Sequence, residues 1–498
     1  MKTNFPKHFV LLFLLSALLT ACGDSTSAEP AVNDAHTMAD TSAEAVTESI
    51  LQANLPDTDW NGRTFMVLGR DEPNYDQFDN FEIWAEKEDG EVVNDAIYRR
   101  NITIEDAYNV KIAQTLYNEP QTELQKSASS GEHLYDLAFV ELMSIGPCIQ
   151  NGYFYNLYDV EYIDFSKPWW NPDVNETVSL CGKLYATTSD FSLRDKNRAY
   201  IMLYNPALAD SYDIPDLIET VRDGKWTSDL MLSYVKLFSG DLDGDSKLGG
   251  EFDSFGLAMD SYNSFAAFSF GMGVQTISKD TDDQPVIMLN NEHAATAVER
   301  VLELTCDSSY ALFCDDFKGK TAEDHWGTAS RAFYSERALF LTTFPHALKT
   351  ASQKAEFDFG VVPFPKLDET QDKYYTLADK NSMLMGIPVT SPEPGFSGFM
   401  LEALSAASST TSLPAYYEIS CKTKYAYNES TGEMLDLIFD GIQYDLSMIY
   451  SIGKTTEILR VELPKTKENT FVSLCEKYQK VGDTALKKLI TAIEELEH

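Results

Sequence analysis

Residues 64–140 alternate between two apolar patterns, and this alternation limits the possible folds more than any other feature of the chain. Short apolar runs typical of buried strands lie at 64–68, 110–113 and 136–140. Between them, 92–107 and 122–129 carry apolar side chains at helical spacing. An order of strand, helix, strand, helix, strand predicts a parallel sheet covered by helices, and therefore an α/β fold.

The ends of these predicted strands carry polar side chains. Ligands of parallel sheets bind beyond the carboxyl ends of the strands. The first strand is followed by Gly69-Arg70-Asp71 and the third by Glu141. We therefore expect Arg70, Asp71 and Glu141 to contribute to a ligand site.

The N-terminus has the order of an export signal. Lys2 and Lys7 precede an apolar run from 9 to 19, which is too short to span a bilayer comfortably. Leu19-Thr20-Ala21-Cys22 follows and resembles a bacterial lipobox. This resemblance implies that residues 1–21 are removed and that Cys22 is lipidated, which would anchor the protein to the outside of the cell membrane.

Composition restricts the partners of the chain. The net charge of -39, from 78 acidic and 39 basic residues, argues against nucleic acid and against anionic lipid surfaces. The apolar share of 44% allows a sizeable core. No second apolar run approaches membrane-spanning length, so the lipid is the expected anchor. Residues 22–55 are rich in small and acidic residues with few aromatics, and we expect a flexible tether there.

Six cysteines follow Cys22: Cys148, Cys181, Cys306, Cys314, Cys421 and Cys475. An even number permits disulfides in an exported protein. Cys306 and Cys314 are close enough in sequence to close a small loop, and whether they pair stays open. The scattered spacing is not that of a disulfide scaffold or a zinc site.

Several short segments follow one another along the rest of the chain. They are Trp169-Trp170, Gly182-Lys183-Leu184-Tyr185, Gly224-Lys225-Trp226-Thr227, Phe359-Gly360-Val361-Val362-Pro363-Phe364-Pro365-Lys366 and Lys424-Tyr425. In this order they resemble the extracellular solute-binding proteins of the sugar-transport class, relatives of the maltodextrin-binding protein. The resemblance covers nearly all of the chain after Cys22.

This resemblance implies a periplasmic-binding-protein-like fold of type II, in which a hinge of crossing strands joins two α/β lobes and the ligand lies between them. The implied parts are lobe 1 at 56–190, lobe 2 at 191–380, a return to lobe 1 at 381–411, and a helical end of lobe 2 at 412–498. Within the last part, apolar spacing predicts a helix from 484 to 496 with Asp483 as its N-cap. The implied function is that of a monomeric, non-enzymatic receptor that presents an oligosaccharide to the membrane permease subunits of an ABC importer.

Aromatic and acidic residues near the implied cleft are candidates for binding a sugar. Aromatic faces stack on the C–H faces of sugar rings, while carboxylates bond the hydroxyl groups. The aromatic candidates, with one neighbouring histidine, are Trp169, Trp170, Tyr262, Trp326, Phe344 and His346. The resemblance places a cleft carboxylate after Gly-Lys-Leu-Tyr, which points to Asp190. Core packing is the alternative for each aromatic, because a chain with 12% aromatic residues must bury most of them.

An Asp-rich loop is a candidate calcium site. Asp241, Asp243 and Asp245 alternate in the way that a calcium loop requires, although Ser246 replaces the usual turn glycine. The resemblance favours a longer loop that Asp253 closes. The predicted residues of a structural Ca²⁺ site are Asp241, Asp243, Asp245, Lys247 and Asp253. The alternative is a flexible acidic loop without an ion.

Signs of catalysis are few. The sequence lacks a Gly-x-Ser-x-Gly elbow and a His-Glu-x-x-His motif. The spacing of a glycosidase carboxylate pair is set by the fold, so the sequence leaves open a surface glycan hydrolase. A calcium-dependent surface adhesion module is a further alternative to the receptor.

Overall fold

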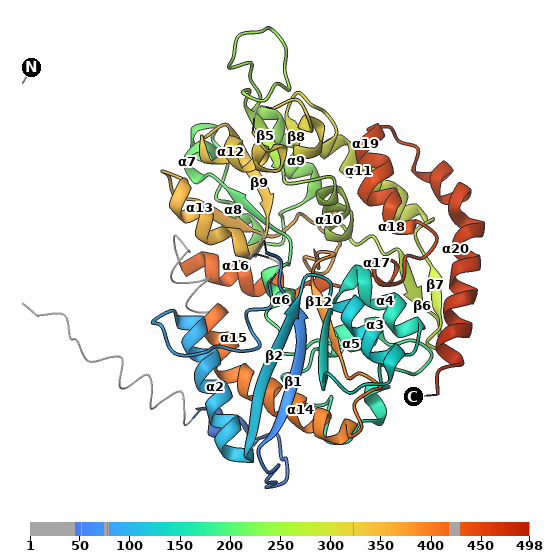
Figure 1. Ribbon diagram of the computed structural model, residues 1–498. Coiled ribbons are helices and arrows are strands. Elements are labelled where there is room, and N and C mark those ends of the chain that lie inside the picture. The colour runs from blue at the N-terminus through green and yellow to red at the C-terminus, as the bar shows by residue number, and fades with distance from the viewer. Residues whose placement is uncertain are drawn as a thin grey trace, which may run out of the picture. The chain divides into compact units, whose positions relative to one another are not determined.

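Figure 1 shows a computed structural model of the chain, which describes residues 45–50, 52–73, 77, 79–321, 323–417 and 429–497. All of these belong to one compact unit, Ser42–His498. The predicted signal peptide, Cys22 and the first part of the tether lie outside the described residues, as do Cys421, Lys424 and Tyr425.

Lobe 1 is built on a four-stranded sheet with the order β12-β3-β1-β2. Its strands are β1 (Arg63–Arg70), β2 (Val110–Tyr117), β3 (Leu137–Glu141) and β12 (Met383–Gly386). β1 pairs in parallel with β2 and β3, and the helices α2 (Val92–Tyr108) and α3 (Pro120–Ser130) connect these strands. The sequence prediction of a parallel α/β sheet is therefore confirmed.

Lobe 2 is built on a five-stranded sheet with the order β10-β4-β9-β5-β8. Its strands are β4 (Ile201–Tyr204), β5 (Phe255–Met259), β8 (Ala311–Phe313), β9 (Ala338–Thr343) and β10 (Gly360–Val362). β5 pairs in parallel with β8 and β9, and every residue of these three strands is buried. Such continuous burial is expected where helices cover both faces of a sheet.

The chain crosses between the two sheets along paired segments. The outgoing and returning segments form antiparallel bridges between Thr187 and Met385 and between Ala199 and Ala378. A third crossing is made by β13 (Ile442–Gln443), which pairs in parallel with β11 (Thr376–Leu377) of the returning segment. The hinge of crossing strands that the resemblance implied is present.

The remaining elements are mostly short helices. They are α4 (Leu142–Gln150), α5 (Pro172–Val178), α6 (Arg194–Asn197), α7 (Pro206–Ser211), α8 (Leu217–Arg222), α9 (Ser228–Leu237), α10 (Asn263–Gly271), β6 (Ile277–Lys279), β7 (Pro285–Ile287), α11 (Glu292–Thr305), α12 (Thr328–Tyr334), α13 (Leu348–Lys354), α14 (Pro394–Thr410), α15 (Ser412–Pro414), α16 (Glu429–Asp440), α17 (Leu446–Tyr450), α18 (Thr455–Glu457), α19 (Leu463–Thr466) and α20 (Phe471–Glu494). The short turns η2 (Leu157–Asp159), η3 (Cys314–Phe317), η4 (His325–Gly327) and η5 (Pro345–Ala347) are 3-10 helices, whereas η7 (Ile458–Glu462) is a π-helix.

The C-terminal part, which the resemblance assigns to lobe 2, contacts both lobes. α16 packs on β10 of lobe 2, but α17 packs on α4 of lobe 1. A Cβ atom at Gly146 in α4 would lie 2.1 Å from the carbonyl oxygen of Ile449 in α17. The contact therefore depends on a glycine, whose missing side chain lets the two backbones meet.

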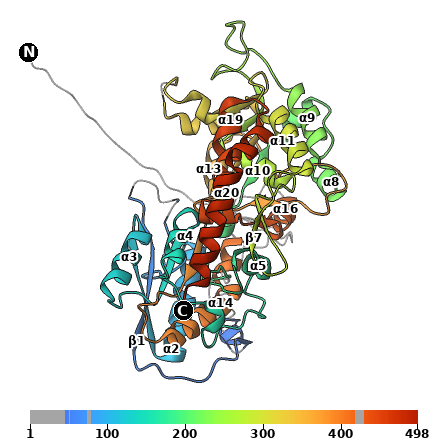
Figure 2. The same ribbon diagram turned by 90° about the vertical axis from the view of Figure 1, so that its right-hand side faces the viewer.

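The last helix, α20, begins at Phe471 and not at Thr484, and Asp483 lies inside it instead of capping it. Gly482 interrupts the apolar spacing, but the structure uses it as a contact: a Cβ atom there would lie 2.5 Å from Cδ1 of Ile287. Figure 2 shows α20 beside β7. At its far end, Nζ of Lys183 donates to the carbonyl oxygen of Leu496 at 2.6 Å, a favourable position for a cation.

The predicted tether is shorter than expected. Residues 45–50 are helical, and Val46, Ile50 and Ala53 are buried in the core of lobe 1. Ser49 Oγ also bonds to Thr410 Oγ1 at 2.8 Å. Val46 and Ile50 are four residues apart, so one helical turn presents both to the protein.

The described cysteines, Cys148, Cys181, Cys306, Cys314 and Cys475, are free thiols, so Cys306 and Cys314 form no disulfide in this structure. Burial raises the pKa values of the Cys148 and Cys314 thiols to about 12, which leaves these two protonated and unreactive. Within the described part of the chain, no helix combines the length and the apolar character needed to cross a bilayer.

Candidate functional site

The carboxyl ends of both sheets meet near the crossing segments, and we call this region the interlobe site. On the lobe 2 side, Asp260 follows β5, Asp315 lies directly beyond β8 and Phe344 follows β9. On the lobe 1 side, Glu141 ends β3 and Met143 lies just beyond it. This is where a parallel sheet is expected to bind its ligand.

Arg460 connects the two sides of the interlobe site. Its Nε donates to Oδ1 of Asn263 in lobe 2 at 2.8 Å, and its Nη1 lies 3.7 Å from Sδ of Met143 in lobe 1. Arg460 lies in the π-helix η7, and π-helical turns are frequent at functional sites. Arg460 was not predicted from the sequence, because it lies in a C-terminal segment with no strand-end signal.

Asp260 is a half-buried carboxylate directly after β5. It accepts hydrogen bonds from Thr342 Oγ1 at 3.2 Å and from Ser264 Oγ. Burial raises its pKa to about 6; the bond from Ser264 opposes that shift, and the charge of Asp379 adds to it. No strand was predicted before Asp260, so the reasoning from strand ends that pointed to Arg70 and Glu141 did not reach this residue, which follows β5.

Arg70 and Glu141, two of the residues predicted to contribute to a ligand site, lie together. Their side chains form an ion pair, and Nη2 of Arg70 also lies 3.0 Å from Oε2 of Glu72. Asp71 is exposed on the loop after β1. Arg70 is thus neutralised by two acids, so its charge is already compensated within the protein.

Phe344 lies in a stack of rings and is only 8% exposed. Its ring centroid is 4.4 Å from that of Tyr200 and 5.4 Å from that of His346. The guanidinium carbon of Arg198 lies 5.5 Å from the centroid of the same ring. Burial, together with Arg198, lowers the pKa of His346 to about 3, so this histidine is neutral. Phe344 and His346 therefore form a wall of the site with little exposed ring surface.

Trp169 and Trp170, which we predicted as sugar-binding residues, are buried and offer almost no ring surface to a ligand. Each is 2% exposed. Their indole N–H groups donate to the two oxygens of Glu402 in α14, at 3.1 Å and 3.0 Å. A buried indole needs an acceptor for its N–H, and here a carboxylate from the returning segment supplies it.

Of the other predicted residues, Tyr262 and Trp326 follow β5 and β8 of the lobe 2 sheet, while Asp190 lies on the outgoing segment, where its backbone N–H donates to the carbonyl oxygen of Trp169. Trp326 in η4 is 54% exposed, and its carbonyl oxygen accepts a bond from Sγ of Cys314, the residue after β8. Tyr262 donates its hydroxyl to Asp316 at 2.8 Å. Asp190 is half-buried, and burial raises its pKa to about 6 while Lys196 opposes the shift. Of the predicted aromatic residues, Trp326 exposes the largest share of its side chain.

The Asp-rich loop projects at the top of Figure 1. Carboxylate oxygens of Asp241, Asp243 and Asp253 lie within 4.8 Å of one another. Ser246 has a φ of 64°, so it adopts the turn conformation that glycine usually supplies. Asp245 is outside this cluster, and its Oδ1 accepts a bond from the backbone N–H of Lys247 at 2.8 Å. Three of the five predicted residues therefore converge, and hard oxygen donors of this kind suit Ca²⁺.

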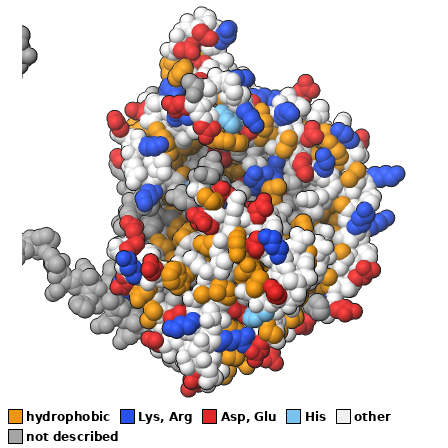
Figure 3. All heavy atoms as spheres, viewed as in Figure 1, with side chains coloured by type: hydrophobic (Ala, Val, Ile, Leu, Met, Phe, Trp, Pro, Cys, Tyr) orange, Lys and Arg blue, Asp and Glu red, His pale blue; other side chains and the backbone are white. Residues whose placement is uncertain are grey.

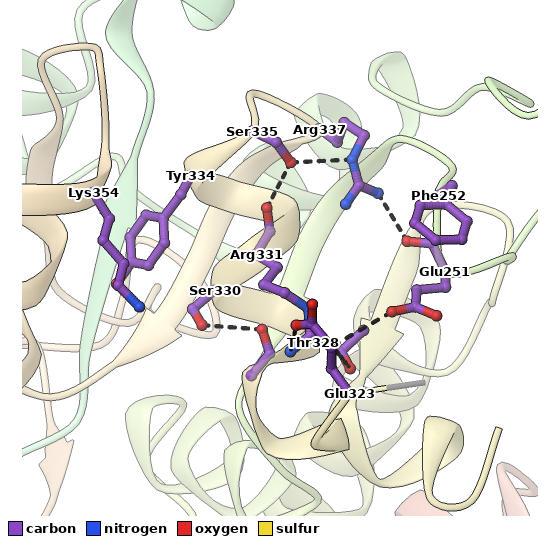
Figure 4. Close-up of a pocket in the computed structure, with 11 residues that line it drawn as sticks. Glu251, Phe252, Glu323, Thr328, Ser330, Arg331, Tyr334, Ser335, Arg337 and Lys354 are labelled. Carbon is purple, nitrogen blue, oxygen red and sulfur yellow. Dashed lines mark hydrogen bonds and ion pairs between the residues drawn. The ribbon is translucent and has the colours of Figure 1, made fainter. Parts of the chain in front are cut away.

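A pocket of about 680 Å³ opens on lobe 2, away from the interlobe site (Figure 4). Phe252 and Arg337 line it, and they lie shortly before β5 and β9, so the pocket is at the amino ends of those strands. Nη2 of Arg331 is 3.4 Å from Oε1 of Glu251, and its Nη1 is 3.4 Å from Oε2 of Glu323. Figure 3 shows side chains of both charges scattered over the face of the molecule that is turned to the viewer in Figure 1. The pocket charges are largely matched within the protein, and its position does not suit a sheet ligand.

No protein-family model matches the sequence, and no curated protein matches it. Solved structures of low sequence identity are nevertheless similar. A cyclo/maltodextrin-binding protein complexed with maltotetraose has a TM-score of 0.52 at 14% identity, over 88% of this chain and 99% of that chain. UspC of M. tuberculosis has 0.54 at 11%, over 85% and 100%. A sugar transporter from Rhizobium etli, in an open conformation, has 0.53 at 13%, over 87% and 100%. The chain therefore has the two-lobe, periplasmic-binding-protein-like α/β fold of these proteins.

Proposed function

We propose that the chain is a solute-binding receptor of an ABC importer, which captures an oligosaccharide between its lobes and presents it to membrane permease subunits. The observation that carries the proposal is the meeting of both sheets' carboxyl ends at the crossing segments, where charged donors and acceptors gather. A protein of the same fold is described as bound to maltotetraose. We expect the receptor to act as a monomer.

The chemistry of the interlobe site suits a sugar. Asp260 and Asp379 offer acceptors, and we expect Trp326, which is exposed and contacts Cys314 after β8, to supply an apolar face. Sugar hydroxyls are donors and acceptors at once, while the C–H faces of the ring pack on aromatics. A receptor of this kind closes around its ligand without turning it over. Closure without turnover separates it from a glycan hydrolase, and binding of a free solute separates it from an adhesion module.

The proposal includes a lipid anchor at Cys22, which rests on the lipobox-like sequence alone. Cleavage before Cys22 would place the mature chain outside the cytoplasmic membrane. Cys22→Ser should therefore release the protein from the membrane fraction or leave its precursor unprocessed. A mutant that fractionates and migrates like the wild type would contradict the anchor.

The proposal also includes a structural Ca²⁺ ion at the Asp-rich loop. Asp241, Asp243 and Asp253 would hold it, because their carboxylates already converge. When bound, the ion supplies charge neutralisation for three acids that otherwise repel one another. The loop lies away from the interlobe site, so we assign the ion no role in ligand binding.

A thermal-shift screen of the mature protein against monosaccharides, oligosaccharides and peptides tests the function. A ligand that binds only the native state raises the melting temperature by mass action. We expect an oligosaccharide to give the largest shift, and small-angle scattering to show a smaller radius of gyration at saturation. A shift with peptides alone would overturn the sugar assignment, and product formation would favour the hydrolase.

A further inference from the structure

A tight turn carries Lys380 at the return crossing, between β11 and β12. The backbone N–H of Ser382 donates to the carbonyl oxygen of Asp379 at 2.8 Å, and the N–H of Asp379 donates to the carbonyl oxygen of Arg198 at 3.0 Å. Lys380 is therefore held at the tip of a fixed turn, on the segment that links the two lobes.

The ammonium group of Lys380 has no hydrogen bond or ion pair with any residue that the structure describes, although its side chain is half-buried. Asp379, Asp260 and Asp315 all lie within electrostatic reach of it. In a chain with twice as many acidic as basic residues, a lysine without an ion pair among three carboxylates needs an explanation.

The three carboxylates are already bonded to other groups. Asp315 accepts the backbone N–H of Tyr262 at 2.7 Å, and Asp379 accepts both N–H groups of Asn381, at 3.0 Å and 2.6 Å. Asp260 accepts the hydroxyls of Ser264 and Thr342. The N–H donors of Lys380 are therefore left for a solute in the interlobe site.

Arg460 lies beside Lys380, and its positive charge acts on that residue. Its guanidinium is bonded to neutral groups on both lobes, Asn263 and Met143, and it forms no ion pair with a described carboxylate. Two neighbouring cations that form no ion pair with a described residue thus lie among three carboxylates.

We propose that Lys380 is a ligand-binding residue that donates hydrogen bonds to the hydroxyl groups of a neutral oligosaccharide, with Arg460 as its neighbour in the site. This rests on the proposed sugar-binding function and deepens it. A charged sugar of either sign would meet like charge as well as opposite charge in this site, because three carboxylates lie beside two cations. A neutral sugar uses both kinds of group, because each hydroxyl both donates and accepts.

The test is calorimetric titration of the mature protein with three neutral probes, maltotetraose, raffinose and cellotetraose, and with two charged ones, trigalacturonic acid and tetrameric glucosamine. We expect a neutral probe to bind, and Lys380→Met to weaken that binding about tenfold or more, since it leaves ligand hydroxyls unpaired. Lys380→Arg keeps the donors and should restore most of the affinity. Lys354→Met is the matched control, because Lys354 is an exposed lysine in the pocket at the other end of the lobe 2 sheet.

The outcomes separate this inference from the proposed function. If a neutral sugar binds the wild type and Lys380→Met equally well, the role of Lys380 is overturned and the receptor stands. If only a charged probe binds, the neutral class is overturned. If no sugar binds the wild type, the proposed function is overturned and this inference with it. Melting temperatures should match across the variants, so a loss of affinity reports on contact and not on folding.

Discussion

Two sets of tryptophans that look alike in the sequence have opposite surroundings in the structure. Trp169 and Trp170 are 2% exposed and share the carboxylate of Glu402, whereas Trp326 is 54% exposed beside the end of β8. The residue type is the same, but Trp169 and Trp170 have a buried acceptor for their indole N–H groups, which holds both rings inside the protein. An indole fixed to a buried carboxylate supports the fold, while an exposed ring remains available to a ligand.

The same comparison applies to the acids. Glu402 is fully buried and accepts three N–H groups, from Trp169, Trp170 and the backbone of Asp164. Asp260 is bonded to hydroxyls beside an ammonium group that has no partner among the described residues. We expect changes at Glu402 to affect folding and changes at the interlobe site to affect binding.

Replacing Glu402 should have the largest effect. Glu402→Leu leaves two buried indole N–H groups and one backbone N–H without an acceptor, which should lower the free energy of unfolding by about 3 kcal/mol or more. Urea unfolding measures the loss. Sugar affinity of the folded fraction should not change. An unchanged unfolding curve would break the comparison, because Trp169 and Trp170 would then not depend on Glu402.

The pH dependence of stability sharpens the comparison. Burial raises the pKa of Glu402 from 4.5 to about 7, so the folded state binds a proton more tightly than the unfolded state. The resulting stabilisation is complete below the pKa that Glu402 has in the unfolded state. It is lost as the pH rises through the pKa that Glu402 has in the folded state. Unfolding free energy should therefore fall by on the order of 2 kcal/mol between about pH 5 and about pH 8.

Glu402→Gln is the control for this pH effect, because it cannot titrate and should flatten the dependence. Asp260, whose pKa is raised to about 6, contributes in the same direction and should leave a smaller slope in that variant. A wild-type protein whose free energy of unfolding rises between about pH 5 and about pH 8 would contradict the prediction.

Calcium removal extends the comparison to a third group of acids. The carboxylates of Asp241, Asp243 and Asp253 converge and would repel one another without a bound cation. Removing Ca²⁺ should therefore lower the free energy of unfolding by about 1 to 2 kcal/mol. Melting in chelator measures this. Asp243→Asn should remove the sensitivity, whereas Asp245→Asn, outside the cluster, should keep most of it. An unchanged melting temperature in chelator, together with no calcium in elemental analysis, would contradict the prediction that the loop binds Ca²⁺.

A pair of tryptophan variants tests the comparison directly, with the smallest effect in free energy. Trp326→Ala removes an exposed stacking surface, so sugar binding should weaken about tenfold while the melting temperature holds. Trp170→Phe removes an indole donor and should do the reverse. Calorimetry and thermal melts on both variants are sufficient, and equal effects from the two would show that exposure does not separate their roles.

The sequence predicted the first part of lobe 1 well because its elements are consecutive along the chain. Its first three strands and two helices follow one another without interruption, so apolar periodicity alone is enough to identify them. Periodicity failed where a glycine served a distant contact. Gly482 looks like a break in the last helix, but Ile287 and Gly453 pack against it from elsewhere in the chain.

By itself the sequence determined the α/β class, the parallel order of lobe 1 and the polar strand ends at Arg70 and Glu141. Only the tertiary structure decided which candidates face the interlobe site. Trp169 and its partner Glu402 are 233 residues apart, and Asp260, Lys380 and Arg460 come from three separate segments. No local pattern encodes such pairings, because burial and hydrogen bonding depend on which distant segment the fold places alongside.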